Sequence, residues 1–133
     1  MRSKQALASY QQNKVIAAGT LDNHKMILML MEGALQKINE AKAGMIKNQI
    51  AKKGEAVSAA ISILEGLRVS VDPSVGEIST NLLDLYAYMT KTLLVANLNN
   101  DISKLDEVHH LLNELKTTWE AIRSEALAIL GKE

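Results

Sequence analysis

Carboxylate and histidine side chains lie close together near residue 110. Glu107 and His110 form a Glu-x-x-His motif, and Glu114 follows one helical turn later. In some helical bundles this spacing supplies the ligands of a di-metal centre, with the ligands pointing into the interior. The same stretch also carries apolar residues such as Leu105 and Val108 at helical spacing. Because these apolar side chains point the opposite way, Glu107, His110 and Glu114 are predicted to face solvent.

No second metal-binding motif accompanies this one. His24 has Leu21 three residues before it, so it does not complete a pair of Glu-x-x-His motifs. The sequence also has no phosphate-binding glycine loop, no Gly-x-Ser-x-Gly nucleophile motif and no cysteine. We therefore predict a protein that is not an enzyme and that has no catalytic residue, metal site or cofactor. A di-metal bundle enzyme remains the weakest alternative.

The composition predicts one helical domain in the cytoplasm. Of 133 residues 47% are apolar, with no Phe and one Pro, a composition that favours helices over sheets. Fifteen basic residues balance fifteen acidic ones, which argues against nucleic acid as a partner. The longest apolar run, residues 26–31, is too short to span a bilayer, and no signal peptide precedes it. The absence of cysteine fits a reducing compartment. We expect no direct membrane insertion.

Apolar periodicity predicts four long helices, over about residues 23–46, 49–71, 77–98 and 102–130. Short connections between them favour an all-α, antiparallel four-helix bundle. The expected organisation is a single domain over residues 1–133, with a bundle at 22–130 and a short N-terminal helix or arm at 1–20. The predicted inward residues are Ile27, Met31, Ala34, Ile38, Ala41 and Met45, then Ile50, Val57, Ile61, Leu64 and Val71, then Ile78, Leu82, Leu85, Met89, Leu93 and Ala96, and finally Leu105, Val108, Leu112, Leu115, Trp119, Ile122, Ala126 and Ile129.

The predicted helix over about residues 77–98 has more apolar surface than one core-facing stripe requires. Leu83, Tyr86, Ala87 and Leu94 extend its apolar arc beyond the inward face. One interpretation is a central helix that several neighbours bury. The other is a groove that holds an apolar partner helix. The predicted helix over about residues 23–46 shows a weaker form of the same feature, since Met26, Met29 and Gly33 are placed away from its core face. The alternative for its methionines is ordinary core packing.

Several segments of the chain resemble the FliS family. They are Tyr-x-x-Asn-x-Val at 10–15, Gly-Ala-Leu at 33–35 and Asn-Leu-x-x-Leu-Tyr-x-Tyr-Met at 81–89, and the likeness continues to residues 111–119. The resemblance implies a helical bundle that binds the C-terminal segment of flagellin, prevents its premature polymerisation and assists its delivery to the flagellar type III export apparatus. The family also engages the membrane-embedded export gate, which is a further expected partner.

The resemblance also indicates which residues to expect at the binding site. An N-terminal cap would be formed by Leu7, Tyr10 and Val15, which occupy part of the flagellin site in the free protein. With the wide apolar arc, this gives a predicted flagellin groove of Met26, Met29, Leu83, Tyr86, Ala87, Thr90 and Leu94. The main alternative is a structural or regulatory helical bundle that self-associates through the same face.

Overall fold

The computed structural model describes the backbone of residues 20–129 and the side chains of residues 23–122. Within this part of the chain the helices are α2 (Thr20–Ile46), α3 (Ile50–Val69), α4 (Glu77–Asn99) and α5 (Ile102–Ile129), with a short 3-10 turn, η1 (Pro73–Val75). The described residues contain no strand, so the all-α prediction is confirmed. Leu7, Tyr10 and Val15 lie outside the described residues.

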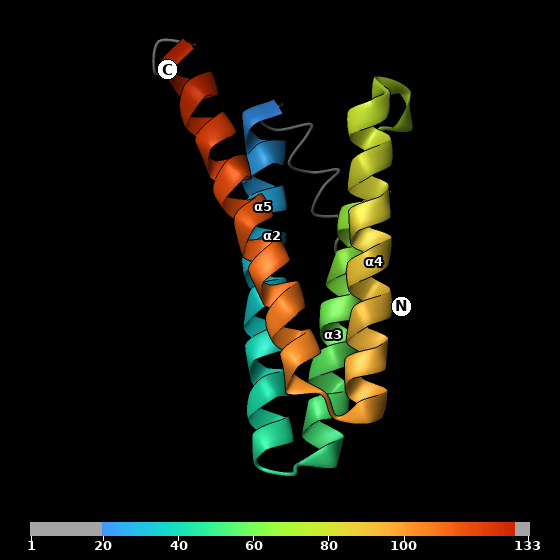
Figure 1. Ribbon diagram of the computed structural model, residues 1–133. Coiled ribbons are helices and arrows are strands. Elements are labelled where there is room, and N and C mark those ends of the chain that lie inside the picture. The colour runs from blue at the N-terminus through green and yellow to red at the C-terminus, as the bar shows by residue number, and fades with distance from the viewer. Residues whose placement is uncertain (1–19, 130–133) are drawn as a thin grey trace.

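The helices form an antiparallel bundle (Figure 1). Each helix runs opposite to the one before it, as short connections require. Helix α2 packs against α3 and α5, and α4 packs against the same two helices. Among the described residues no contact joins α2 to α4 or α3 to α5, so these pairs lie diagonally across the bundle.

Both connections at one end of the bundle use an asparagine in the left-handed conformation. Asn48, with a φ of 57°, ends α2, and Asn100, with a φ of 54°, ends α4. The backbone N–H groups that follow close each turn, Gln49 N on Gly44 O at 2.8 Å and Asp101 N on Ala96 O at 2.9 Å. These are the C-terminal capping bonds that a left-handed residue permits.

The predicted core of α2 is confirmed in full, while that of the other helices is confirmed in part. Ile27, Met31, Ala34, Ile38, Ala41 and Met45 are all buried. In α3, Ile50 is exposed, which corrects the prediction that it faces inward. In α5, Leu105, Val108 and Leu112 are buried, whereas Ile122 is largely exposed because α5 there extends away from α4 (Figure 1). Val71 lies beyond the end of α3.

The predicted inward face of α4 is confirmed at Met89, Leu93 and Ala96, which are buried, but differs from the observed one at other positions. Ile78, expected in the core, is exposed, and Tyr86 is buried instead. Ser79 and Thr92 are also buried on this helix. Their hydroxyls donate to backbone carbonyls, of Asp72 and Tyr88 respectively, which lets polar side chains occupy a buried position. Apolar periodicity could not reveal that Ser79 and Thr92 are buried. The predicted inward face was therefore displaced around the helix axis, with Ile78 wrongly included and Tyr86 left out.

Candidate functional site

One line of side chains along α4 forms the candidate site. Leu83, Ala87, Thr90 and Leu94 are spaced by four, three and four residues, so they lie on one side of the helix over about 16 Å. Ala87 is exposed and Leu94 is 55% exposed, while Leu83 and Thr90 are half-buried. We call these four residues the α4 stripe. It presents apolar surface beside the core face of α4 instead of inside it.

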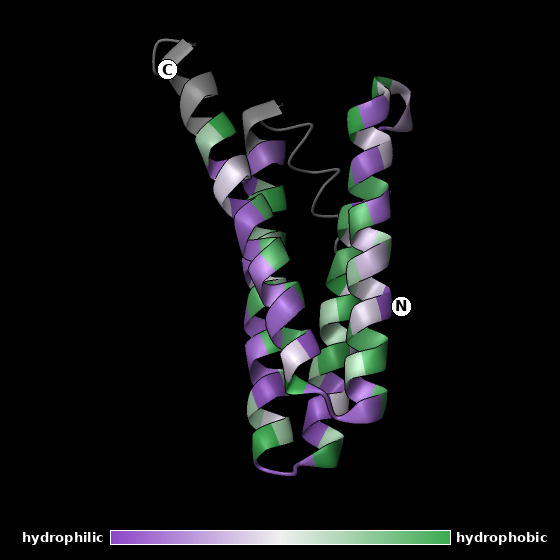
Figure 2. Cartoon of the chain, in the orientation of Figure 1, coloured by the Kyte–Doolittle hydropathy of each residue, from purple (hydrophilic) through white to green (hydrophobic). Residues whose placement is uncertain are grey.

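Helix α3 packs against α4, the helix that carries the α4 stripe. Lys53 Nζ donates to Asn97 O at 3.0 Å and to Asn100 Oδ1 at 2.9 Å, which ties the start of α3 to the end of α4. Val57 and Ile61 follow Lys53 at four-residue steps, so they lie on the same side of α3 as Lys53, the side that faces α4. Val57 is buried and Ile61 is half-buried. In Figure 2 hydrophobic segments recur along the visible faces of α3 and α4, whereas the visible face of α5 is mainly hydrophilic.

Three other predicted groove residues lie elsewhere. Met26 is 1% exposed and Tyr86 is 3% exposed, so both are core residues. The prediction that Met26 faces away from the core of α2 was wrong, because the apolar arc of that helix is wide enough to bury it between neighbours. Met29 is exposed, but it lies on α2, which makes no contact with α4 in the described part of the chain. The structure therefore groups Leu83, Ala87, Thr90 and Leu94 without the other three.

Tyr86 gives the buried side of α4 a measurable property. Burial raises the pKa of Tyr86 to about 12, because the phenolate would lose its hydration. The folded pKa thus lies above the unfolded value of about 10. Stability linked to Tyr86 is complete below about pH 10 and is lost as the pH rises toward 12, where the unfolded chain has released a proton that the folded protein retains.

We expect a Tyr86→Phe variant to lose less stability at high pH than the unchanged protein. Between about pH 9 and about pH 11 the free energy of unfolding should fall by about 1 kcal/mol more in the unchanged protein than in the variant. Urea unfolding at the two pH values measures this difference, and other titrating groups contribute equally to both proteins. Equal pH dependence would show that Tyr86 ionises normally in the fold.

Trp119 joins α5 to α2 in a way that the sequence did not indicate. It was predicted as a plain core residue, but its side chain is only half-buried. Its Nε1 donates to His24 O at 3.1 Å. Its ring stacks on that of His24, with centroids 4.8 Å apart and an interplanar angle of 15°. This contact fixes the part of α5 that extends beyond the buried core.

The carboxylate and histidine residues near 110 are engaged with other groups at the surface. The Tyr88 hydroxyl donates to Glu107, and His110 Nε2 lies 3.2 Å from Glu114 Oε2. His110 and Glu114 are exposed and Glu107 is half-buried. Among the described side chains, those of residues 23–122, no group of three or more acidic or histidine residues is arranged to hold a metal ion. No helix between residues 20 and 129 is long and apolar enough to cross a membrane.

Comparison with known proteins identifies the family. Residues 3–126 match the family model of the flagellar protein FliS. The flagellar secretion chaperone FliSB of Pseudomonas aeruginosa is 40% identical over 124 residues, 92% of this chain and 98% of that relative. The flagellar secretion chaperone FliS of Salmonella typhimurium is 36% identical over 129 residues, 95% of this chain and 96% of that relative. The FliS of Bacillus subtilis is 30% identical over 118 residues, 88% of this chain and 86% of that relative. This chain therefore belongs to the FliS family.

Proposed function

We propose that this protein is a flagellar secretion chaperone that binds the C-terminal segment of flagellin on the α4 stripe. The observation that carries the proposal is the exposure of Ala87 and Leu94 in line with half-buried Leu83 and Thr90. A preformed bundle with such a line of side chains suits an amphipathic client helix that anchors at spacings of three and four residues. The names of the relatives from Pseudomonas aeruginosa and Salmonella typhimurium, both flagellar secretion chaperones, support the same function.

The mechanism is protection by burial and involves no chemical reaction. A client segment that is disordered alone orders on the bundle and buries its apolar face against α4. While it is held there, that face is not available for polymerisation with other flagellin molecules. The complex forms in the bacterial cytosol and is delivered to the flagellar type III export apparatus, where the export gate receives it. Neither nucleotide nor metal takes part.

A cap formed by Leu7, Tyr10 and Val15 completes the proposal. Their apolar side chains would cover part of the client surface in the free protein and leave when the client binds. We expect a Tyr10→Ala variant to raise the fluorescence of a dye that binds exposed apolar surface, because the weakened cap uncovers the α4 stripe more often. Addition of the client segment should bring both proteins to the same low signal. An unchanged signal in the free variant would contradict the role of Tyr10 as a cap.

Calorimetric titration with the C-terminal segment of flagellin from the same bacterium tests the central proposal. Saturable one-to-one binding with a negative heat-capacity change is expected, since apolar surface is buried on both partners. An absence of binding to the folded protein would overturn the assignment of flagellin as client. Sedimentation at several protein concentrations tests the alternative, a bundle that self-associates through the α4 stripe. A mass that stays monomeric as concentration rises supports the chaperone.

A further inference from the structure

The end of the bundle where α2 turns into α3 carries large apolar side chains on its surface. Ile46, the last residue of α2, is 62% exposed, and Ile50, the first of α3, is 76% exposed. In Figure 1 the α2–α3 turn is the lowest point of the ribbon and projects beyond the α4–α5 turn. Ile50 also lines a shallow pocket of about 250 Å³ between this turn and the α4–α5 turn, together with Gly44, Asn48, Gln49, Lys53 and Asn100.

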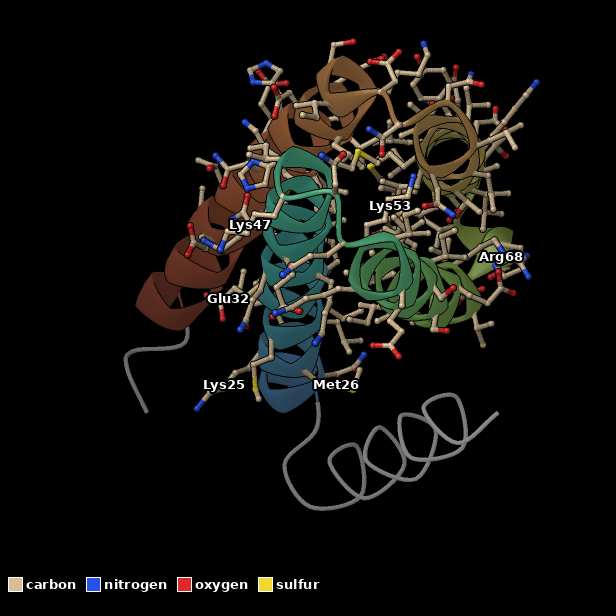
Figure 3. The ribbon with its side chains drawn as sticks, turned by 90° about the horizontal axis from the view of Figure 1, so that it is seen from below. Lys25, Met26, Glu32, Lys47, Lys53 and Arg68 are labelled. Carbon is tan, nitrogen blue, oxygen red and sulfur yellow. The ribbon has the colours of Figure 1, made fainter. Side chains whose placement is uncertain are left out.

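The same end has an uneven distribution of charge. Residues 41–54 contain four lysines and no acidic residue, in a chain whose fifteen basic and fifteen acidic residues balance. Lys42 pairs with Asp106 at 2.9 Å, and Lys53 donates to uncharged oxygens of α4 and the α4–α5 turn. Lys47 and Lys52 form no ion pair with any described residue. Viewed from this end, Lys47 and Lys53 both lie beside the α2–α3 turn (Figure 3).

Two acidic groups lie on the neighbouring turn and at the start of α5, and neither pairs with Lys47 or Lys52. Asp101 accepts hydrogen bonds from the backbone N–H and the hydroxyl of Ser103, and its pKa is lowered mainly by that hydroxyl. It therefore caps the start of α5. Asp106 is the partner of Lys42. The charge of Lys104, on the same helix, also lowers the pKa of Asp101, so these two groups offset each other.

The surface is held rigidly. Asn48 in the left-handed conformation and the bond from Gln49 N to Gly44 O close the α2–α3 turn. Lys53 joins this turn to the α4–α5 turn through its bonds to Asn97 and Asn100. Ile46 and Ile50 are thus presented without a conformational change that would have to precede binding.

We propose that this end, formed by Ile46 and Ile50 with Lys47 and Lys52, is a peripheral contact site for an anionic lipid surface. Exposed aliphatic side chains enter the boundary between headgroups and acyl chains, while neighbouring lysines attract anionic headgroups. A projecting turn with exposed aliphatic side chains can insert into a bilayer, whereas the pocket of about 250 Å³ beside Ile50 is too small to hold a partner helix. The site lies at the end of the bundle, whereas the α4 stripe runs along its side, so it does not depend on the identity of the client.

Flotation of the full chain with lipid vesicles tests the proposal. The vesicles contain either phosphatidylcholine alone or phosphatidylcholine mixed with phosphatidylglycerol. Binding is expected to the mixed vesicles and to weaken at high salt, because screening shortens the reach of the lysine charges. A Lys47→Gln/Lys52→Gln variant should bind the mixed vesicles more than about tenfold more weakly. An Ile46→Ser/Ile50→Ser variant should lose binding at both salt concentrations.

Two matched controls make the test specific to this end. Lys25→Gln/Lys91→Gln removes the same charge from exposed positions elsewhere, and Val75→Ser/Ile78→Ser removes exposed apolar side chains near the start of α4. Both should bind vesicles like the unchanged protein. Equal losses in the controls, or no preference for anionic vesicles, would overturn the proposal. Capture by an immobilised acidic peptide without any vesicle binding would also overturn it, since the surface would then serve an acidic protein partner.

Discussion

An aspartate placed in the α4 stripe is expected to weaken flagellin binding more than tenfold while the bundle stays folded. Ala87→Asp and Leu94→Asp each put a carboxylate where the proposed client helix would bury its apolar face. A charge buried without a partner is costly, and tenfold in affinity corresponds to only about 1.4 kcal/mol. Ala87 is exposed and Leu94 is 55% exposed, so neither change removes a core side chain. Titration calorimetry with the flagellin segment gives the two dissociation constants.

Val75→Asp is the matched control for these variants. Val75 is another exposed aliphatic residue, but it lies in η1 and outside the α4 stripe. It should bind flagellin as the unchanged protein does, and urea unfolding should give all three variants a stability close to that of the unchanged protein. Undiminished binding by both Ala87→Asp and Leu94→Asp would remove the α4 stripe from the proposed client site. A loss shared by Val75→Asp would point to a general effect of added negative charge.

How far the sequence predicted the fold depended on how much of each helix is apolar. In α2 a single row from Ile27 to Met45 gave the inward direction correctly, because polar residues bound that row on most of the helix. In α4 the apolar arc covers too much of the circumference to define one direction. Buried Ser79 and Thr92 then moved the true core face, and their carbonyl acceptors exist only in the folded backbone.

The candidate site was predictable to a similar extent. Periodicity alone placed Leu83, Ala87, Thr90 and Leu94 on α4, since residues separated by three or four positions share a side of any helix. Periodicity could not show that Tyr86 belongs to the core and not to the candidate site. Tyr86 is next to Ala87 in sequence, which places it 100° away around the helix, and it is buried. The contact of Trp119 with His24 lies beyond such reasoning, because it joins residues 95 positions apart through a backbone carbonyl.

The close approach of α2 and α3 gives the largest expected effect on stability. Gly44 lies in the last turn of α2 and is buried. A Cβ atom at this position would lie 3.0 Å from both the backbone nitrogen and the Cβ of Lys53, and 3.1 Å from its Cα. Two of these three atoms are backbone, so the start of α3 would have to move. That movement would strain the bonds from Lys53 to Asn97 and Asn100 as well.

Gly54→Ala is the matched change on the facing helix. Gly54 is in α3, and a Cβ atom there would meet no other atom within 4 Å. Replacing a helical glycine by alanine gains about 1 kcal/mol in both cases. Overpacking offsets that gain only at Gly44, at a typical cost of about 1 to 3 kcal/mol. We therefore expect Gly54→Ala to raise the free energy of unfolding and Gly44→Ala to lower it.

Urea unfolding followed by circular dichroism measures both variants. If the helices meet as described, the urea midpoint should rise for Gly54→Ala and fall for Gly44→Ala, and the m-value should stay the same. A larger residue, as in Gly44→Val, should lower the midpoint further, because both γ-carbons and the poorer helix propensity of valine add to the strain. A Gly44→Ala protein more stable than the unchanged chain would mean that α2 and α3 can separate at this turn. The α2–α3 tip would then not be the rigid platform on which the lipid-contact proposal depends.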